Sequence, residues 1–328
     1  MARTGRVTSQ DVARSLGISR ATVGFVLNDT PGSRISEETR RRVLAEAERL
    51  GYRPHTAAQA LARGGSRLVL FVLPDWPIDV QLRRHLAEAE QELDRAGYSM
   101  VTYSRHAGAR SRPLWEVLEP EVVVGLAPFD AEQLAALHAA GITRIVPDGA
   151  VSGGLSELPS QAEGPRLQVE HLVERGHRVL GFGASADPRL SELSAVRAAA
   201  AVARAGELGL PEPIVRAVEE PDASTSLAEW RARGVTAVAA YNDDVAAAVA
   251  GTAQRTGLDV PGDLAVIGHD DTPLARLFVP GLTSVQVDVR GLGRYVAAQA
   301  LASAGHAGGG RALGMPDVGA DVVVRDST

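Results

Sequence analysis

Apolar segments of strand length alternate with amphipathic segments of helix length through most of residues 67–328. The run LVLFVL at 68–73 is apolar throughout, as in a strand buried on both faces, and Pro74 ends it. Residues 80–96 place apolar side chains on one face at helical spacing. Further strands are predicted at 98–103, 122–126, 143–146, 177–182, 235–241 and 264–268, and further helices near 131–140, 166–175, 190–208 and 243–256. This alternation predicts doubly wound parallel sheets, and its two successive series predict two lobes with a ligand cleft between them.

Two residue types are absent from the chain, and their absence excludes whole classes of chemistry. There is no Cys, which excludes disulfides, thiolate metal sites and cysteine nucleophiles. There is no Lys, so all 34 basic residues are Arg. A Walker lysine, a Schiff-base lysine and a lysine general base are therefore excluded. The eight His are scattered without metal-ligand spacing, and we expect neither a metal nor a cofactor.

Charge is distributed unevenly along the chain. Residues 1–65 hold 11 Arg against 6 acidic residues, whereas residues 66–328 hold 23 Arg against 34 acidic residues. A basic head on an acidic body is typical of a nucleic-acid reader joined to another domain, and a chance cluster of solvated charges is the alternative. No apolar run approaches the roughly 20 residues of a membrane span. The segment MARTGR at 1–6 lacks the apolar core of a signal peptide, so we expect a cytoplasmic protein.

The basic head contains three short predicted helices. Thr8 and Asp11 form a capping-box pattern, and Gly17 ends the helix that follows. Ser19 caps a second helix, so two short helices flank a tight turn, which is the helix-turn-helix pattern. Ser36 caps a third helix. The residues predicted to face a shared core are Val12, Ala13, Leu16, Val23, Val26, Leu27, Val43, Leu44, Ala47 and Leu50.

The second of these helices is the candidate DNA reader. If its N-terminus enters a major groove, Ser19 and Thr22 offer hydroxyls and amides to phosphates. Arg20, Ala21 and Phe25 then face base edges, where Arg bonds to guanine and Ala or Phe contacts a thymine methyl. A generic three-helix domain that binds another protein is the alternative.

The head resembles the lactose-repressor (LacI/GalR) family. The matching segments are VTSQDVA at 7–13, GISRATV at 17–23, VLN at 26–28, IS at 35–36 and GYRP at 51–54. In that family the head binds half of a palindromic operator. The resemblance therefore implies DNA contacts by Thr8, Ser19, Arg20, Ala21, Thr22, Phe25 and Asn28. The family often has Ser-Arg or Ser-Tyr where this chain has Gly24-Phe25, so we expect a different operator preference at that position.

Residues 55–64, HTAAQALARG, match the hinge helix of the family, which folds when two protomers occupy an operator. By resemblance, His55, Ala58 and Leu61 contact DNA, and Leu61 is the apolar side chain that opens a central base step in the minor groove. Unstacking that step costs roughly a few kcal/mol, which contacts to the bent duplex offset. A lone apolar residue in a linker helix is the alternative for Leu61.

The resemblance extends through most of the body. The matching segments are VEHL at 169–172, GHR at 176–178, NDD at 242–244, VPGDL at 260–264, IGHDD at 267–271, PGLTSV at 280–285 and VRDST at 324–328. The body of the family resembles periplasmic sugar-binding proteins, and its lobes shift when an effector enters the cleft. We therefore expect an α/β chain with a helix-turn-helix head and a two-lobed, periplasmic-binding-protein-like body.

Polar residues at the ends of predicted strands are the candidate effector ligands. Asp148, Asn242 and Asp270 occupy such ends, where open parallel sheets bind ligands and where the family pattern places effector contacts. Carboxylate and amide groups suit the hydroxyl and N–H groups of a sugar. Turn formation or helix capping is the alternative for Asn242 and Asp270. Leu73, Asp75 and Trp76, after the first strand, are predicted to form the floor of the site.

One position of the body departs from the family. An Arg usually opens the helix that follows residues 183–185, and alignment places Glu192 there. Arg189, one turn earlier, is the candidate substitute. Without such a cation an anionic effector loses its best partner, which favours a neutral sugar.

Other functional classes are less consistent with the chain. GFGASA at 181–186 resembles a dinucleotide fingerprint, but Pro188 falls where its helix would begin. His269 beside Asp270 is a candidate general base for an enzyme, but no nucleophile or oxyanion motif accompanies it. A pure ligand-binding protein would not need the basic head.

The sequence therefore predicts a DNA-binding transcription repressor rather than an enzyme. Its partners are double-stranded operator DNA, a small effector such as a sugar, and a second copy of the chain. No heptad-rich extension follows the body, so we expect a homodimer. We place the DNA-binding domain at 1–54, the hinge and linker at 55–66, and the effector-binding and dimerisation domain at 67–328, with its lobes divided near 160 and near 288.

Overall fold

The computed structural model describes residues 7–27, 35–52, 65–104, 106, 110–147, 159–306 and 319–328, and only the backbone of 159–161. The chain forms two compact units. The first comprises residues 1–68 with 118–121, and the second comprises residues 69–117 with 122–328. Among the residues described, no helix has both the length and the apolar character needed to cross a membrane.

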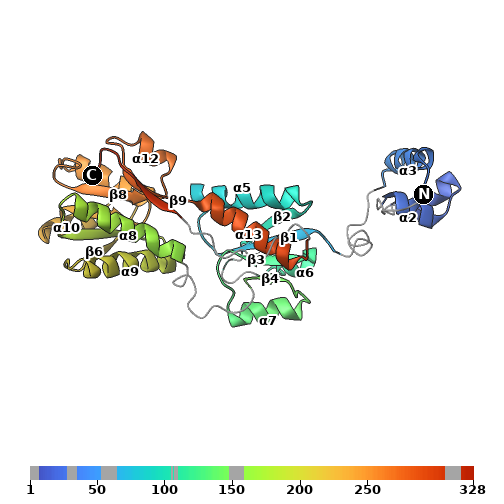
Figure 1. Cartoon of the computed structure of the whole chain (residues 1–328), viewed down its shortest axis with the longest axis horizontal. Helices are drawn as coiled ribbons and strands as arrows, with labels where there is room; N and C mark the ends of the chain where they lie inside the picture. Colours follow the sequence, from blue (N-terminus) through green and yellow to red (C-terminus); the bar gives the residue numbers. More distant parts are fainter. Residues whose placement is uncertain are drawn as a thin grey trace. The chain divides into compact units, whose positions relative to one another are not determined.

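Among its described residues, the first unit contains the helices α1 (Ser9–Leu16), α2 (Arg20–Leu27) and α3 (Glu37–Arg49) (Figure 1). The predicted capping box is present, because Asp11 N donates to Thr8 Oγ1 at 3.3 Å and Thr8 N donates to Asp11 Oδ2 at 2.9 Å. Gly17 ends α1 with φ +67°, the left-handed conformation that glycine adopts without strain. The tight turn between α1 and α2 therefore follows directly from local sequence.

Apolar side chains from all three helices pack together in a small core. Its fully buried members are Val12, Ala13, Val23, Val26, Val43 and Ala47. The prediction that Leu44 belongs to this core is wrong, because its side chain is 49% exposed. Leu44 directly follows Val43 on α3, so the helix turns it about 100° away from the buried stripe.

The second unit contains two sheets, and the smaller one forms the first lobe. Its strands are ordered β2 (Ser99–Ser104), β1 (Leu68–Leu73), β3 (Val122–Gly125) and β4 (Ile145–Val146), with β1, β3 and β4 parallel. Helices α5 (Val80–Arg95) and α13 (Val289–Ser303) pack on one face, where Phe71 and Leu93 are buried. Helices α6 (Leu114–Leu118) and α7 (Ala131–Ala139) contribute Trp115 and Leu137 to the core on the other face.

The larger sheet forms the second lobe. Its strand order is β10 (Ala320–Val323), β9 (Thr283–Val287), β8 (Ala265–His269), β7 (Ala237–Ala240), β5 (Leu180–Ser185) and β6 (Ile214–Val218). All neighbouring pairs are parallel except β10 with β9. The helices are α8 (Pro159–Glu174), α9 (Ser191–Glu207), α10 (Ser224–Ala232), α11 (Asp243–Arg255) and α12 (Pro273–Leu277). Helix α8 packs with α9, and α10 packs with α11, so the sheet is doubly wound as predicted.

The chain crosses between the lobes at three places. It enters the second lobe at α8 and returns to the first between β9 and α13. It then crosses once more, because β10 pairs with β9 in the larger sheet (Figure 1). The sequence analysis did not predict this last return, since a four-residue strand gives a weak periodic signal.

Two predicted boundaries are wrong by several residues. The strand predicted at 177–182 is β5, which runs from Leu180 to Ser185. His177 and Arg178 instead form a connection, in which His177 Nδ1 lies 2.9 Å from Thr236 Oγ1 and Arg178 Nη1 donates to the Val173 carbonyl at 2.9 Å. The helix predicted near 166 begins earlier, at Pro159, and contains Pro165 within it.

Candidate functional site

Helix α2 presents an exposed face near its N-terminus. Arg20, Ala21 and Phe25 are exposed, and Phe25 is 45% exposed although it is a large apolar residue. Ser19 precedes the helix, and its Oγ accepts a hydrogen bond from Thr22 N at 3.0 Å. The predicted base-reading side chains are thus all accessible on α2. Asn28, His55, Ala58 and Leu61 lie outside the residues that the structure describes.

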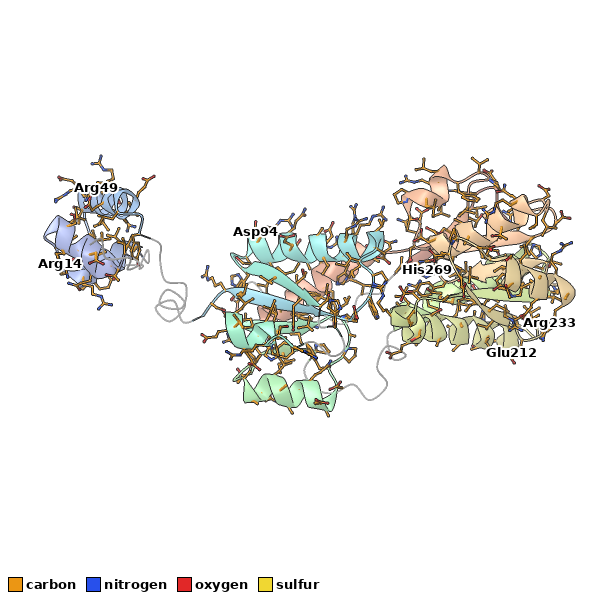
Figure 2. The ribbon with its side chains drawn as sticks, turned by 180° about the vertical axis from the view of Figure 1, so that it is seen from behind. Arg14, Arg49, Asp94, Glu212, Arg233 and His269 are labelled. Carbon is orange, nitrogen blue, oxygen red and sulfur yellow. The ribbon has the colours of Figure 1, made fainter. Side chains whose placement is uncertain are left out.

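Several Arg side chains of the first unit are held by neighbouring acids. Arg14 Nη1 lies 3.2 Å from Asp11 Oδ1, and Arg49 Nη2 lies 2.6 Å from Glu46 Oε1; Figure 2 labels both arginines. The Ser15 hydroxyl also bonds Glu46, which joins α1 to α3. Within the described part of the chain Arg20 has no ion pair, so its guanidinium is available to an acceptor outside the protein.

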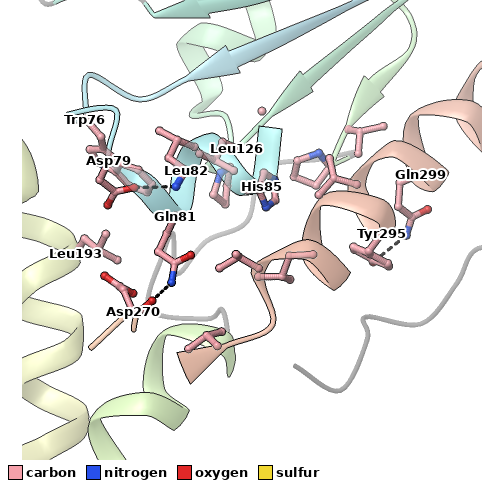
Figure 3. Close-up of a pocket in the computed structure, with 18 of the residues that line it drawn as sticks. Trp76, Asp79, Gln81, Leu82, His85, Leu126, Leu193, Asp270, Tyr295 and Gln299 are labelled. Carbon is pink, nitrogen blue, oxygen red and sulfur yellow. Dashed lines mark hydrogen bonds between the residues drawn. The ribbon is translucent and has the colours of Figure 1, made fainter. Parts of the chain in front are cut away.

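A cavity of about 680 Å³ lies in the second unit, between the two lobes. Its walls come from α5 and α13 of the first lobe and from α9, the end of β8 and Tyr241 of the second (Figure 3). Helix α5 contributes Gln81, Leu82 and His85, and α9 contributes Leu193 and Arg197. Burial lowers the pKa of His85 to about 4, so this wall residue is neutral at physiological pH. A volume of this size is typical of small-molecule sites, which measure roughly 300–1,000 Å³.

Asp270 borders this cavity on a turn with unusual backbone geometry. The φ angles of Asp270 and Asp271 are +95° and +41°, in the region that favours glycine. Asp271 N donates to Ser284 Oγ at 3.1 Å, and the Gln81 amide donates to the Asp270 carbonyl (Figure 3). Such strain persists only where the surroundings hold it, and it is common at binding sites.

Arg197 enters the cavity wall from α9 and is only 9% exposed. Its Nη1 donates to the Tyr241 carbonyl at 2.6 Å, and its guanidinium lies 4.7 Å from the centre of the Tyr241 ring. Its Nη2 lies 3.6 Å from Asp270 Oδ1. Burial alone would raise the pKa of Asp270, but the charge of Arg197 and the contact with His269 lower it. Asp270 is therefore ionised and fixed in place.

His269 orients Asp270 rather than acting as a base. Its Nδ1 lies 2.7 Å from Asp270 Oδ1, and burial lowers the pKa of the imidazole. A neutral ring then donates its Nδ1 proton to Asp270 and leaves Nε2 without a partner. Gly164 of α8 packs against this ring, since a Cβ there would lie 2.0 Å from Nε2.

Asp243, at the start of α11, stabilises the turn that contains Asp270 and Asp271. Its side chain is completely buried and accepts hydrogen bonds from Ser284 Oγ and Thr272 N, each at 2.6 Å. Burial raises its pKa to about 7. A Cβ at Gly268 would lie 2.2 Å from Asp243 Oδ1, so only glycine fits there.

Asp79 brings a second carboxylate to the cavity from the first lobe. It caps α5, with Oδ1 accepting from Leu82 N at 2.7 Å. Burial raises the pKa of Asp79, and the nearby Asp270 carboxylate adds to this effect while Arg197 opposes it. The cavity therefore holds one acidic side chain from each lobe.

The structure separates the residues that were predicted to bind an effector. Trp76 and Asp270 line the large cavity, whereas Leu73 and Asp75 line a neighbouring cavity of about 210 Å³. Asn242 caps α11, since its Oδ1 accepts from Val245 N at 2.9 Å, and it does not line either cavity. Arg189 pairs with Asp187 at 2.6 Å outside both cavities. Asp148 lies outside the described residues.

Several cavity residues were missed by the sequence analysis. Arg197, and not Glu192 or Arg189, supplies the cation, because Glu192 is exposed on the first turn of α9. Arg197 follows the buried Leu193 by one helical turn, and a charged residue on a buried stripe was the available signal. Asp79 and Gln81 carried no such signal, because the start of a helix normally holds capping residues.

Comparison with family models places both parts of the chain. A model described as bacterial regulatory proteins of the lacI family matches residues 8–55. A model described as a periplasmic binding protein-like domain matches residues 169–328. Together these matches cover most of the first unit and most of the second lobe.

Curated relatives match along nearly the whole chain. The HTH-type transcriptional regulator GalS of Salmonella typhimurium is 30% identical over 323 residues, which covers 91% of this chain and 90% of that protein. GalR of Escherichia coli is 29% identical over 326 residues, with coverage of 90% and 89%. An HTH-type transcriptional regulator from the aml 5' region of Streptomyces limosus is 32% identical over 306 residues, with coverage of 86% and 84%.

Solved structures share the fold. The Lac repressor dimer bound to operator and the anti-inducer ONPF aligns with a TM-score of 0.74 at 24% identity, covering 98% of this chain and 99% of that one. The regulator CelR in complex with cellobiose aligns with a TM-score of 0.64 at 21% identity, covering 98% and 100%. At this level of identity the likeness concerns the architecture.

Proposed function

Because the chain belongs to the LacI family of bacterial regulatory proteins, we propose that it is a repressor that binds a palindromic operator as a homodimer. An effector in the cavity between the lobes controls that binding. The observation that carries the proposal is that Arg20, Ala21 and Phe25 are all exposed on α2, while Val23 and Val26 of the same helix are buried in the three-helix core. Its relatives are transcription regulators rather than enzymes.

The chemistry of the head matches the needs of a major-groove reader. Ser19 and Thr22 present hydroxyls at the start of α2, where backbone N–H groups also favour phosphate. Arg20 bonds guanine bidentately, and Phe25 contacts a thymine methyl. By family resemblance we also assign DNA contacts to Thr8, Asn28, His55, Ala58 and Leu61.

Selection from a random duplex library with the full-length protein tests the proposal. We expect enrichment of a palindrome, because two heads related by a two-fold axis read two half-sites. Arg20→Ala should cost about 1–3 kcal/mol per half-site and relax the preference at one base pair. The matched control is Arg233→Ala, an exposed arginine of the second unit (Figure 2), which should leave the selected sequence unchanged. Enrichment without any palindrome would contradict the proposal.

An apolar pair on the second lobe supports the homodimer. Leu277 and Val279 are each 79% exposed at the end of α12. Adjacent exposed apolar side chains mark interaction surfaces in soluble proteins. We assign this surface to a second copy of the chain, because a palindromic operator needs two heads in one particle.

Leu277→Glu should therefore weaken the dimer. Burial of a leucine side chain contributes about 1.5–3 kcal/mol, so the dissociation constant should rise by about tenfold or more. Analytical ultracentrifugation of the full chain measures this. Leu208→Glu, at an apolar position that is 38% exposed after α9, is the control and should leave the constant unchanged. Equal effects of both substitutions would remove Leu277 from the interface.

The cavity between the lobes is the proposed effector site. Asp270 and Arg197 provide an acceptor and a donor for a sugar or a related metabolite, and Trp76 provides an apolar wall. The site joins both lobes, so a bound effector changes the balance between their arrangements. Linkage then requires that operator and effector alter each other's affinity by the same factor.

A further inference from the structure

The charged groups that line the cavity do not balance. Among the described lining residues there are two carboxylates, Asp79 and Asp270, and one guanidinium, Arg197. The two imidazoles, His85 and His269, are neutral near pH 7, because burial lowers the pKa of both. The lining therefore carries one more negative than positive charge. An anionic effector is disfavoured here, although an arginine is present.

The single cation is already engaged by the second lobe. Arg197 interacts with Asp270 and donates to the Tyr241 carbonyl through its Nη atoms. Arg197 lines the cavity and is nine-tenths buried. Its Nε is also buried and has no hydrogen-bond partner in the protein. A ligand oxygen, as in a hydroxyl or a sugar ring, would satisfy this donor.

Asp79 is the lining carboxylate that lacks an ion pair among the described residues. Its Oδ1 accepts the capping hydrogen bond of α5 from Leu82 N at 2.7 Å. Burial, and to a lesser degree the nearby carboxylate of Asp270, raise its pKa, while the charge of Arg197 and the backbone N–H groups of α5 oppose this rise only in part. Trp76 lies beside it on the cavity wall (Figure 3). An indole face next to a carboxylate is a favourable surface for a cation.

From this arrangement we propose that the effector carries a protonated amine, which binds between Asp79 of the first lobe and Asp270 of the second. The remainder of the ligand is a polyol whose oxygen accepts from Arg197 Nε. An amino sugar combines both features in a size that the 680 Å³ cavity accommodates. This assignment rests on the proposed function, and it names the chemical class of the effector at that site.

The amine also explains why the two lobes would respond. Each carboxylate belongs to a different lobe, and the two repel each other in a partly desolvated space. A cation between them converts this repulsion into attraction across the cavity. The Gln81 side chain, which already bonds the Asp270 carbonyl from α5, lies at the same junction (Figure 3).

Calorimetric titration of the full-length protein with a matched series tests the assignment. The probes are glucosamine, galactosamine and mannosamine, each with its neutral hexose and its N-acetyl form. At least one amine should bind about tenfold or more tightly than its neutral parent. Asp79→Asn should remove that advantage, because Asn caps α5 as well as Asp does but carries no charge. Asp94→Asn, which removes an exposed charge from the same helix (Figure 2), should leave binding unchanged.

Each remaining outcome overturns the assignment. If a neutral hexose binds as tightly as its amine, if no amino sugar binds at millimolar concentration, or if Asp79→Asn leaves amine binding intact, the ligand is not held by this pair of carboxylates. The proposed function is judged separately, by operator selection without any ligand. A palindrome enriched by a protein that ignores every amine would therefore refute only the effector class.

Discussion

Gly268→Ala should destabilise the second unit by about 3–9 kcal/mol. The added Cβ would lie 2.2 Å from Asp243 Oδ1 and 3.3 Å from the Ala246 side chain. Overpacking of a core costs about 1–3 kcal/mol. Displacing the buried carboxylate also breaks its bonds to Ser284 and Thr272, and each unsatisfied group adds about 1–3 kcal/mol.

Urea unfolding followed by tryptophan fluorescence measures this loss. The three tryptophans of the chain all lie in the second unit, so the signal reports that unit alone. Gly206→Ala is the matched control, since a Cβ at this exposed position of α9 meets no atom within 4 Å. It should stabilise the protein by about 0.5–1 kcal/mol, as expected for glycine in a helix.

A double substitution distinguishes a clash with Asp243 from any other effect of replacing Gly268. If Asp243 is the group that Gly268→Ala displaces, the combination with Asp243→Ala should cost less than the sum of the two single changes. Strict additivity would show that the carboxylate and the glycine do not interact. The turn that carries Asp270 would then have to be held by other contacts.

Local chemistry made the head predictable from sequence. The capping box at Thr8, the break at Gly17 and the cap at Ser19 each act within a few residues, so the pattern alone located α1 and α2. The error at Leu44 arose because Leu44 lies at the edge of the apolar face of α3. The small core buries Val43 and Ala47 but does not extend as far as Leu44.

The body was predictable in class but less so in its details. Strongly apolar runs such as 68–73 became strands, because a segment buried on both faces must be apolar along its whole length. Short strands at the edge of the larger sheet, including β6 and β10, were not predicted. Their pairing depends on partners that are distant in the sequence, which no local pattern records.

The site was the least predictable part, because its members come from elements of both lobes. Asp270 was predicted from its place at the end of a strand and lines the cavity, whereas Arg197, which also lines it, was not predicted because the alignment pointed to the first turn of α9. Asn242, at a similar strand end, caps a helix instead. Strand ends alone do not distinguish a residue that faces a ligand from one that satisfies its own backbone.

Asp243 should make the stability of the second unit depend on pH. Its pKa rises from 3.8 to about 7 in the folded protein, mainly because it is buried, which corresponds to about 4 kcal/mol. The folded state therefore holds a proton that the unfolded state releases above pH 3.8. The stability that comes from this bound proton is complete below pH 3.8 and is lost as the pH rises towards 7.

Asp243→Asn isolates that contribution. The amide oxygen accepts from Thr272 N and the amide nitrogen donates to Ser284 Oγ, so both contacts persist without a titrating group. Between pH 5 and pH 7 the unfolding free energy of the natural protein should fall relative to the variant by about 1.4 kcal/mol per pH unit. Urea titrations at several pH values measure this difference in unfolding free energy. Glu212→Gln, at an exposed site (Figure 2), is the control, and its unfolding free energy should depend on pH in the same way as that of the natural protein. If the unfolding free energies of Asp243→Asn and of the natural protein also depended on pH in the same way, Asp243 would already be ionised at pH 5. Burial would then not hold its proton.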